Sequence, residues 1–166
     1  MRHPTRIRWA LAVLLLLGSA AGGVLAIVRA APGGPGRIAT PAEIPWAQLD
    51  LRGRAPATRH TPLAILYVQR RCPHCRRTAY LVDSLGDALG VATLLITNDA
   101  DTVAETYARE LRLRRPLARD TARAFARRFR IAYAPTLIAF DRDDRETRHL
   151  GSGSEATFHS ILRGIR

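Results

Sequence analysis

Two cysteines, Cys72 and Cys75, occur in the chain, and they lie inside the octapeptide Arg-Arg-Cys-Pro-His-Cys-Arg-Arg (70–77). The run Leu-Ala-Ile-Leu-Tyr-Val (63–68) precedes this motif and has the length and composition of a buried strand. After the motif, Val82, Leu85 and Leu89 recur at a spacing that gives a helix one apolar face. The sequence therefore predicts that the two cysteines lie where a strand ends and a helix begins.

Two cysteines with this spacing at the first turn of a helix can close a small ring that is readily reduced. We expect Cys72 at the helix N-cap and Pro73 at the first helical position, where the missing N–H of proline costs nothing. The positive end of the helix, the flanking arginines (including Arg71) and a hydrogen bond from His74 all act to lower the pKa of the Cys72 thiol. Cys75, further into the helix, would then resolve a mixed disulfide.

The cysteine pair could serve two other roles. A purely structural disulfide is a weak explanation, because closing so short a loop removes little entropy from the unfolded chain. A metal site made of Cys72, His74 and Cys75 is conceivable, but the motif offers few ligands and the chain has no second cysteine pair. We therefore expect a redox site that needs no metal and no cofactor.

The remainder of the chain alternates between strand-like and helix-like segments. A strand is expected over 91–97, and a helix capped by Asn98 or Asp99 should follow it. The segment 111–117 contains a proline and can form only a short edge strand. Asp120 should cap another helix, the segments 135–140 and 145–150 should form a hairpin, and Ser154 should cap a terminal helix. This order predicts an α/β domain of three layers around a central mixed sheet.

The N-terminus has the features of a membrane anchor. Residues 1–8 are basic, and the next 20 residues (9–28) carry no charge, which as a helix spans about 30 Å, the thickness of a bilayer core. We expect an uncleaved signal-anchor helix with its N-terminus in the cytoplasm, and cleavage near 18–20 is the alternative. Residues 29–60 would then be a linker and N-terminal edge segment, and 61–166 a domain in the periplasm or another extracytoplasmic space.

The charge of the chain is +12, and all 26 of its basic residues are arginine. A basic chain can bind nucleic acid, but here the arginines are interleaved with 14 acidic residues and no helix–turn–helix pattern accompanies them. We therefore expect no nucleic-acid partner. An anionic membrane surface or acidic partner proteins suit this charge better.

The order of elements, the Cys-Pro-His-Cys motif and the later Ala134-Pro135-Thr136 resemble the thioredoxin superfamily, from about Pro62 onward. The anchor is similar to that of its exported TlpA-like branch, and the Pro-His pair to that of DsbA oxidases. The resemblance implies that Pro135 is cis and lies against the sulfurs, and that its neighbours Ala134 and Thr136 pair with a bound peptide. Two positions depart from the family pattern: Arg71 replaces a common tryptophan, and Leu66 replaces the buried aspartate of thioredoxin.

We therefore expect an enzyme that exchanges disulfides with client proteins outside the cytoplasm and is itself recharged by a redox partner protein. The sequence leaves open whether it oxidises or reduces those clients. Two other functions are also left open: a thioredoxin-fold copper chaperone, and a redox factor dedicated to cytochrome c assembly.

Overall fold

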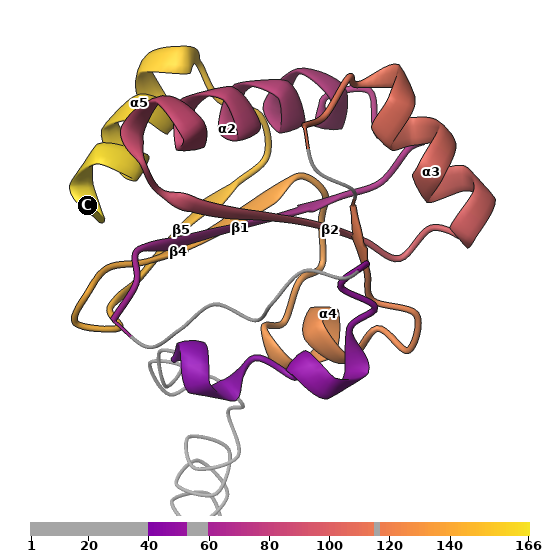
Figure 1. The fold of residues 1–166 in the computed structure, drawn as a ribbon, viewed down its shortest axis with the longest axis horizontal. Coiled ribbons are helices and arrows are strands. Elements are labelled where there is room, and N and C mark those ends of the chain that lie inside the picture. The colour runs from indigo at the N-terminus through magenta and orange to yellow at the C-terminus, as the bar shows by residue number, and fades with distance from the viewer. Residues whose placement is uncertain (1–39, 53–59, 115–116) are drawn as a thin grey trace, which may run out of the picture. The chain divides into compact units, whose positions relative to one another are not determined.

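A five-stranded mixed sheet forms the centre of the computed structural model, which describes residues 40–52, 60–114 and 117–166. The strand order is β3-β2-β1-β4-β5, with β1 in the middle (Figure 1). Strands β1, β2 and β3 run parallel, whereas β4 is antiparallel to both β1 and β5. The strands are β1 (Leu63–Val68), β2 (Ala92–Thr97), β3 (Ala118–Arg119), β4 (Thr136–Phe140) and β5 (Glu146–Leu150).

Helices cover both faces of the sheet, as predicted for three layers. Figure 1 shows α2 and α5 over one face and α4 with two short 3₁₀ helices over the other. Residues of α3 pack into the same core as α2 and α5. The helical elements are η1 (Pro41–Glu43), η2 (Trp46–Gln48), α2 (Cys75–Leu89), α3 (Asp101–Glu110), α4 (Ala124–Arg128) and α5 (Glu155–Gly164).

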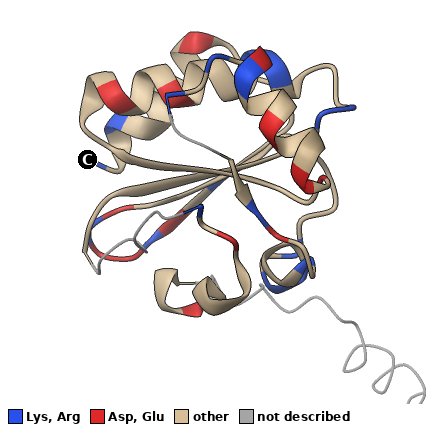
Figure 2. Cartoon of the chain, turned by 45° about the vertical axis from the view of Figure 1, so that its right-hand side comes forward, with Lys and Arg blue, Asp and Glu red and all other residues tan. Residues whose placement is uncertain are grey.

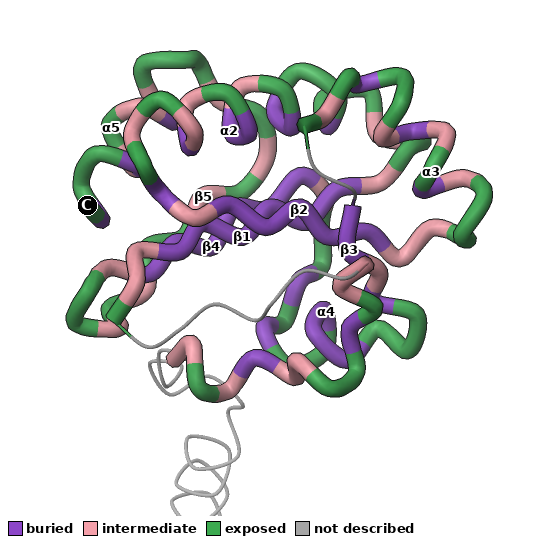
Figure 3. Tube along the Cα trace, in the orientation of Figure 1, coloured by how far each residue is buried: buried purple, intermediate pink, exposed green. Residues whose placement is uncertain are grey.

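The central strand β1 is buried on both faces, and this explains why its sequence is apolar without a break (Figure 3). Ala64, Leu66 and Val68 enter the core under α2 and α5. The alternate residues of β1 enter the core that α4 closes. The strand that precedes the cysteines is thus fixed from both sides.

Most of the expected elements are present, and Ser154 caps α5 by accepting a hydrogen bond from Thr157 N at 3.1 Å. The prediction of an edge strand over 111–117 was wrong. Residues 111–112 form a turn after α3, and the edge strand β3 is the residue pair Ala118–Arg119 beside the end of β2. A proline has no N–H to donate to a strand ladder, which disfavours a longer strand in this segment of the sequence.

The predicted caps of α3 and α4 were also wrong. The N-cap of α3 is Ala100, which has no side-chain cap. Asp99 instead accepts hydrogen bonds from Arg70 N and the Thr97 hydroxyl, and so ties the end of β1 to that of β2. Asp120 precedes α4 by more than one turn, yet its buried carboxylate accepts from Phe125 N (3.1 Å) and Ala126 N (2.9 Å).

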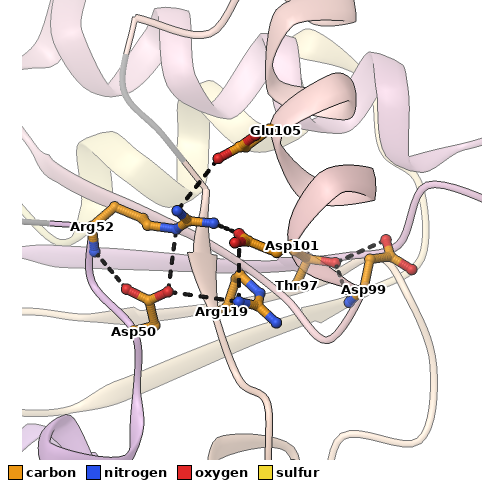
Figure 4. A network of polar contacts seen from close by, with 7 residues as sticks. All are labelled: Asp50, Arg52, Thr97, Asp99, Asp101, Glu105 and Arg119. Carbon is orange, nitrogen blue, oxygen red and sulfur yellow. Dashed lines mark hydrogen bonds and ion pairs between the residues drawn. The ribbon is translucent and has the colours of Figure 1, made fainter.

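The segment 40–52 packs against the sheet. Ile44 and Leu49 are buried in the core on the α4 side. Asp50 and Arg119 exchange two backbone hydrogen bonds of 2.9 Å. Arg52 forms ion pairs with Asp50 and with two acids of α3, Asp101 and Glu105 (Figure 4).

The predicted anchor (9–28) lies outside the described residues. Among the residues that are described, no helix combines the length and apolar character needed to cross a bilayer.

Candidate active site

Cys72 and Cys75 form a disulfide in the turn that joins β1 to α2. The turn is closed by two backbone hydrogen bonds, from Cys72 N to Gln69 O (3.1 Å) and from Cys75 N to Cys72 O (3.2 Å). The helix begins later than predicted: its N-cap is His74 and its first residue is Cys75. Cys72 and Pro73 therefore lie in the turn before α2, and Cys75 occupies its first position rather than a deeper one.

The two sulfur-bearing residues differ in exposure. Cys75 has no exposed surface and belongs to the core under α2, whereas Cys72 is only partly buried. Pro73 and His74 between them are exposed. A thiolate arriving from solvent therefore has access to Cys72 and not to Cys75.

The loop before β4 lies directly against Cys72. The Ala134–Pro135 peptide bond is cis, as the resemblance implied, and the Ala134 carbonyl oxygen is 3.3 Å from Cys72 Sγ. Thr136 begins β4 opposite Tyr67 of β1, and its hydroxyl donates to the Tyr133 carbonyl at 2.7 Å. The fold thus brings the Ala134 carbonyl oxygen next to Cys72, which lies 62 residues earlier in the chain.

Several positive groups surround the disulfide. Arg71, Arg76 and Arg77 are exposed, and the N-terminus of α2 adds its unpaired N–H groups. Arg70 is neutralised by Glu110 of α3 across 2.8 Å, and this hydrogen bond lowers the pKa of the Glu110 carboxyl. Arg76 and Arg77 of α2 line one pocket together with Glu110 at the end of α3. Figure 2 shows basic residues in blue and acidic residues in red along the helices of this domain.

These groups do not all act in the direction that the sequence predicted. The helix terminus and the arginines favour a thiolate at Cys72, but the Ala134 carbonyl oxygen favours the protonated thiol, which can donate a hydrogen bond to it. No hydrogen bond joins the His74 side chain to either sulfur among the described residues. The state of the reduced site is therefore a balance between the α2 terminus and the loop before β4.

The surroundings of Cys75 are apolar. Leu66, at the position where thioredoxin has its aspartate, has no exposed surface and packs in the same core as Cys75.

Glu110 and Tyr107 of α3 line a pocket of about 290 Å³ together with Cys72. Burial raises the pKa of Tyr107 to about 12, and Arg76 opposes that rise. The hydroxyl of Tyr107 has no hydrogen-bond partner among the described residues.

Sequence reasoning did not assign Glu110, Tyr107 or Tyr133 to the site. The first two lie more than 30 residues after Cys72, on a helix whose pattern shows only which side is buried. Tyr133 precedes the cis-proline loop and is 71% exposed. None of the three has a local pattern that marks it, because its neighbours in the site come from other elements.

Among the described residues, no three His, Cys, Asp or Glu side chains are grouped so that they could hold a metal ion. No observation favours the copper-binding alternative made of Cys72, His74 and Cys75.

Solved structures of other proteins have a fold similar to that of this chain. A secreted disulfide oxidoreductase of Mycobacterium tuberculosis, described as homologous to DsbE of E. coli, superposes with a TM-score of 0.60 at 15% identity, over 64% of this chain and 84% of its own. The chain has a thioredoxin-like fold. Two further proteins share this fold. A thioredoxin family thiol:disulfide interchange protein of Chlorobium tepidum superposes with a TM-score of 0.58 at 18% identity, over 64% of this chain and 81% of its own. StoA of Bacillus subtilis superposes with a TM-score of 0.53 at 15% identity, over 63% of this chain and 84% of its own. No protein-family model and no curated protein sequence matches the chain.

Proposed function

We propose that the protein is a thiol–disulfide oxidoreductase that exchanges disulfides with protein cysteines through Cys72 and Cys75. The observation that carries this proposal is the disulfide itself, with one half-accessible sulfur next to a cis-proline loop and the other buried. The solved structures of similar fold include proteins described as disulfide oxidoreductases and interchange proteins, which supports the same chemistry.

The reaction starts with a client thiolate that attacks Cys72 Sγ. The Cys72–Cys75 bond breaks, a mixed disulfide forms between the client and Cys72, and Cys75 leaves as a thiolate that takes up a proton. A second client thiolate then attacks the client sulfur of the mixed disulfide, and Cys72 leaves. Two electrons thereby pass from the client to the enzyme. In the reverse sequence the reduced Cys72 attacks a client disulfide, Cys75 then attacks Cys72 in the mixed disulfide, and the client is reduced instead.

The residues around Cys72 have separate tasks in these steps. The N-terminus of α2 and Arg71 stabilise negative charge on Cys72 when it leaves. The peptide around Ala134, Pro135 and Thr136 holds the client backbone beside the sulfur. Pro73 and His74 leave the approach to Cys72 open, because both lie in the exposed turn.

The site of action is proposed to lie outside the cytoplasm, with residues 9–28 as the membrane anchor. The 20 uncharged residues and the arginines before them support this placement. One of the proteins of similar fold is described as secreted.

Trapping the mixed disulfide tests the function. The Cys75→Ala variant of the full-length protein has no resolving thiol, so its clients should stay attached to Cys72 and migrate as adducts on a non-reducing gel. The matched control is the Cys72→Ala/Cys75→Ala double variant, which should form none. A gel without adducts, together with no insulin reduction and no oxidation of a dithiol peptide by the wild type, would overturn the proposal.

The direction of electron flow follows from a second measurement, the reduction potential of the Cys72–Cys75 couple. A value near that of thioredoxin, about −270 mV, would indicate a reductase, and a value near that of DsbA, about −120 mV, an oxidase. The trapped adducts also identify the clients, and a single trapped apocytochrome would narrow the role to cytochrome c assembly.

A further inference from the structure

A basic groove runs from Cys72 between α2 and α3. It consists of two adjoining pockets of about 290 and 400 Å³, which share Pro73, Arg76 and Glu110. The other residues that line it are Arg70, Arg71, Cys72, Arg77, Tyr80, Tyr107, Leu111 and Arg112. This groove starts at the accessible cysteine, and its lining includes no residue of the loop before β4.

The groove carries a net charge of +4, because five arginines and one glutamate line it. Glu110 is bound to Arg70. Over the described ranges 40–52, 60–114 and 117–166, no acid forms an ion pair with any of the other four arginines, Arg71, Arg76, Arg77 and Arg112. Arginines elsewhere, such as Arg52 and Arg148, do pair with acids. The groove therefore keeps positive charge that the rest of the fold does not neutralise.

The walls of the groove also offer apolar and hydrogen-bonding surface. Tyr80 is 59% exposed, and within the described part of the chain only Tyr133 and Leu150 are other large apolar side chains left open to solvent. Tyr107 forms part of the lining next to Cys72, and its hydroxyl lacks an acceptor among the described residues. The Tyr107 hydroxyl is itself buried, so a carboxylate that enters this pocket meets Arg76 as its counterion instead.

We propose that the basic groove binds an acidic segment of the client polypeptide, a few residues from the cysteine that reacts with Cys72. This inference rests on the proposed function and names the class of substrate. A chain linked to Cys72 in the mixed disulfide must leave the sulfur on one side or the other, at about 3.3 Å per extended residue. On the β4 side it meets the cis-proline loop, and on the α2 side its next two to four residues lie in the groove.

The expected preference is moderate. An exposed pair of a carboxylate and a guanidinium contributes little alone, so two or three such pairs should raise the rate of exchange by about tenfold. The preference should fall steeply with salt, because the pairs are open to solvent and the Debye length shortens to about 3 Å at 1 M.

The test compares two dithiol peptides of the same length, one with Asp and Glu at the residues next to its cysteines and one with Ser and Gln there. The oxidised full-length protein is mixed with each peptide, and the second-order rate of exchange is measured at low salt and at 1 M salt. The wild type should react about ten times faster with the acidic peptide at low salt and equally with both at high salt.

Charge reversal assigns the preference to the groove. Arg76→Glu, in both pockets, should abolish or invert the ratio of the two rates. The matched control Arg163→Glu, an exposed position at the end of α5, should leave the ratio unchanged. The ratio is the readout, because any effect of Arg76 on the sulfur itself alters both rates alike.

The outcomes separate the two proposals. If the oxidised wild type exchanges with neither dithiol peptide and the reduced wild type with neither peptide in its disulfide form, the proposed function fails. If it exchanges with both at equal rates at low salt, or if Arg76→Glu and Arg163→Glu alter the ratio equally, the function stands and the acidic-client inference is overturned.

Discussion

Gly86 of α2 shows how tightly the helix that carries Cys75 is packed. A Cβ atom added at this position would lie 2.1 Å from Thr93 Cγ2 of β2, and 3.4 Å from Thr93 Cβ. Thr93 is buried and β-branched, so its methyl group has little freedom to move away. The sequence alone would suggest the opposite, because alanine is about 1 kcal/mol better than glycine inside a helix.

We expect Gly86→Ala to lower the free energy of unfolding by about 2 kcal/mol. Overpacking a buried contact costs about 1–3 kcal/mol, and an overlap this deep falls at the upper end, from which the helix preference of about 1 kcal/mol is subtracted. With an unfolding entropy of about 2.1 cal/mol/K per residue over roughly 125 residues, the melting temperature should fall by about 8 °C.

Urea unfolding of the oxidised full-length protein, followed by circular dichroism, measures the change. In a Thr93→Ser background the methyl group is absent, so Gly86→Ala should cost almost nothing or stabilise the fold there. Gly164→Ala is the matched control, since no atom lies within 4 Å of a Cβ at that helical glycine. An equal loss for Gly86→Ala in both backgrounds, or a gain in the wild type, would refute the packing argument.

Two further predictions concern buried polar groups. Asp120→Ala leaves the N–H groups of Phe125 and Ala126 buried without their acceptor, so it should lower the free energy of unfolding by about 2–4 kcal/mol in the urea assay. Asp120→Asn keeps one accepting oxygen and should lower it less; equal losses for the two variants would contradict this. Burial raises the pKa of Tyr67 and of Tyr107 to about 12, so the folded state holds both protons more tightly than the unfolded state does. The free energy of unfolding should therefore be insensitive to these groups below pH 10 and fall between pH 10 and 12. Tyr107→Phe should reduce this fall, and a free energy of unfolding that stays constant over this pH range would disprove the prediction.

The local pattern was sufficient to predict the elements around the cysteines. The apolar run of β1 is uninterrupted because the strand is buried on both faces. The helical spacing of apolar residues that follows it reflects burial of one face of α2. The helix start was predicted two residues too early, because a turn after β1 satisfies the same preferences of proline and histidine as a first helical turn. Caps were less predictable, since Asp99 and Asp120 find their donors in elements that only the fold brings near.

The sequence by itself determined that this chain carries a pair of cysteines between a strand and a helix, in a basic environment, because those features are contiguous. Only the tertiary structure decided which sulfur is accessible, since burial of Cys75 depends on β1, α2 and α5 packing together. It also decided which groups face Cys72: the Ala134 carbonyl comes from a loop 62 residues away and Glu110 from a helix 38 residues away. These contacts are long-range, and no local preference of the chain encodes them.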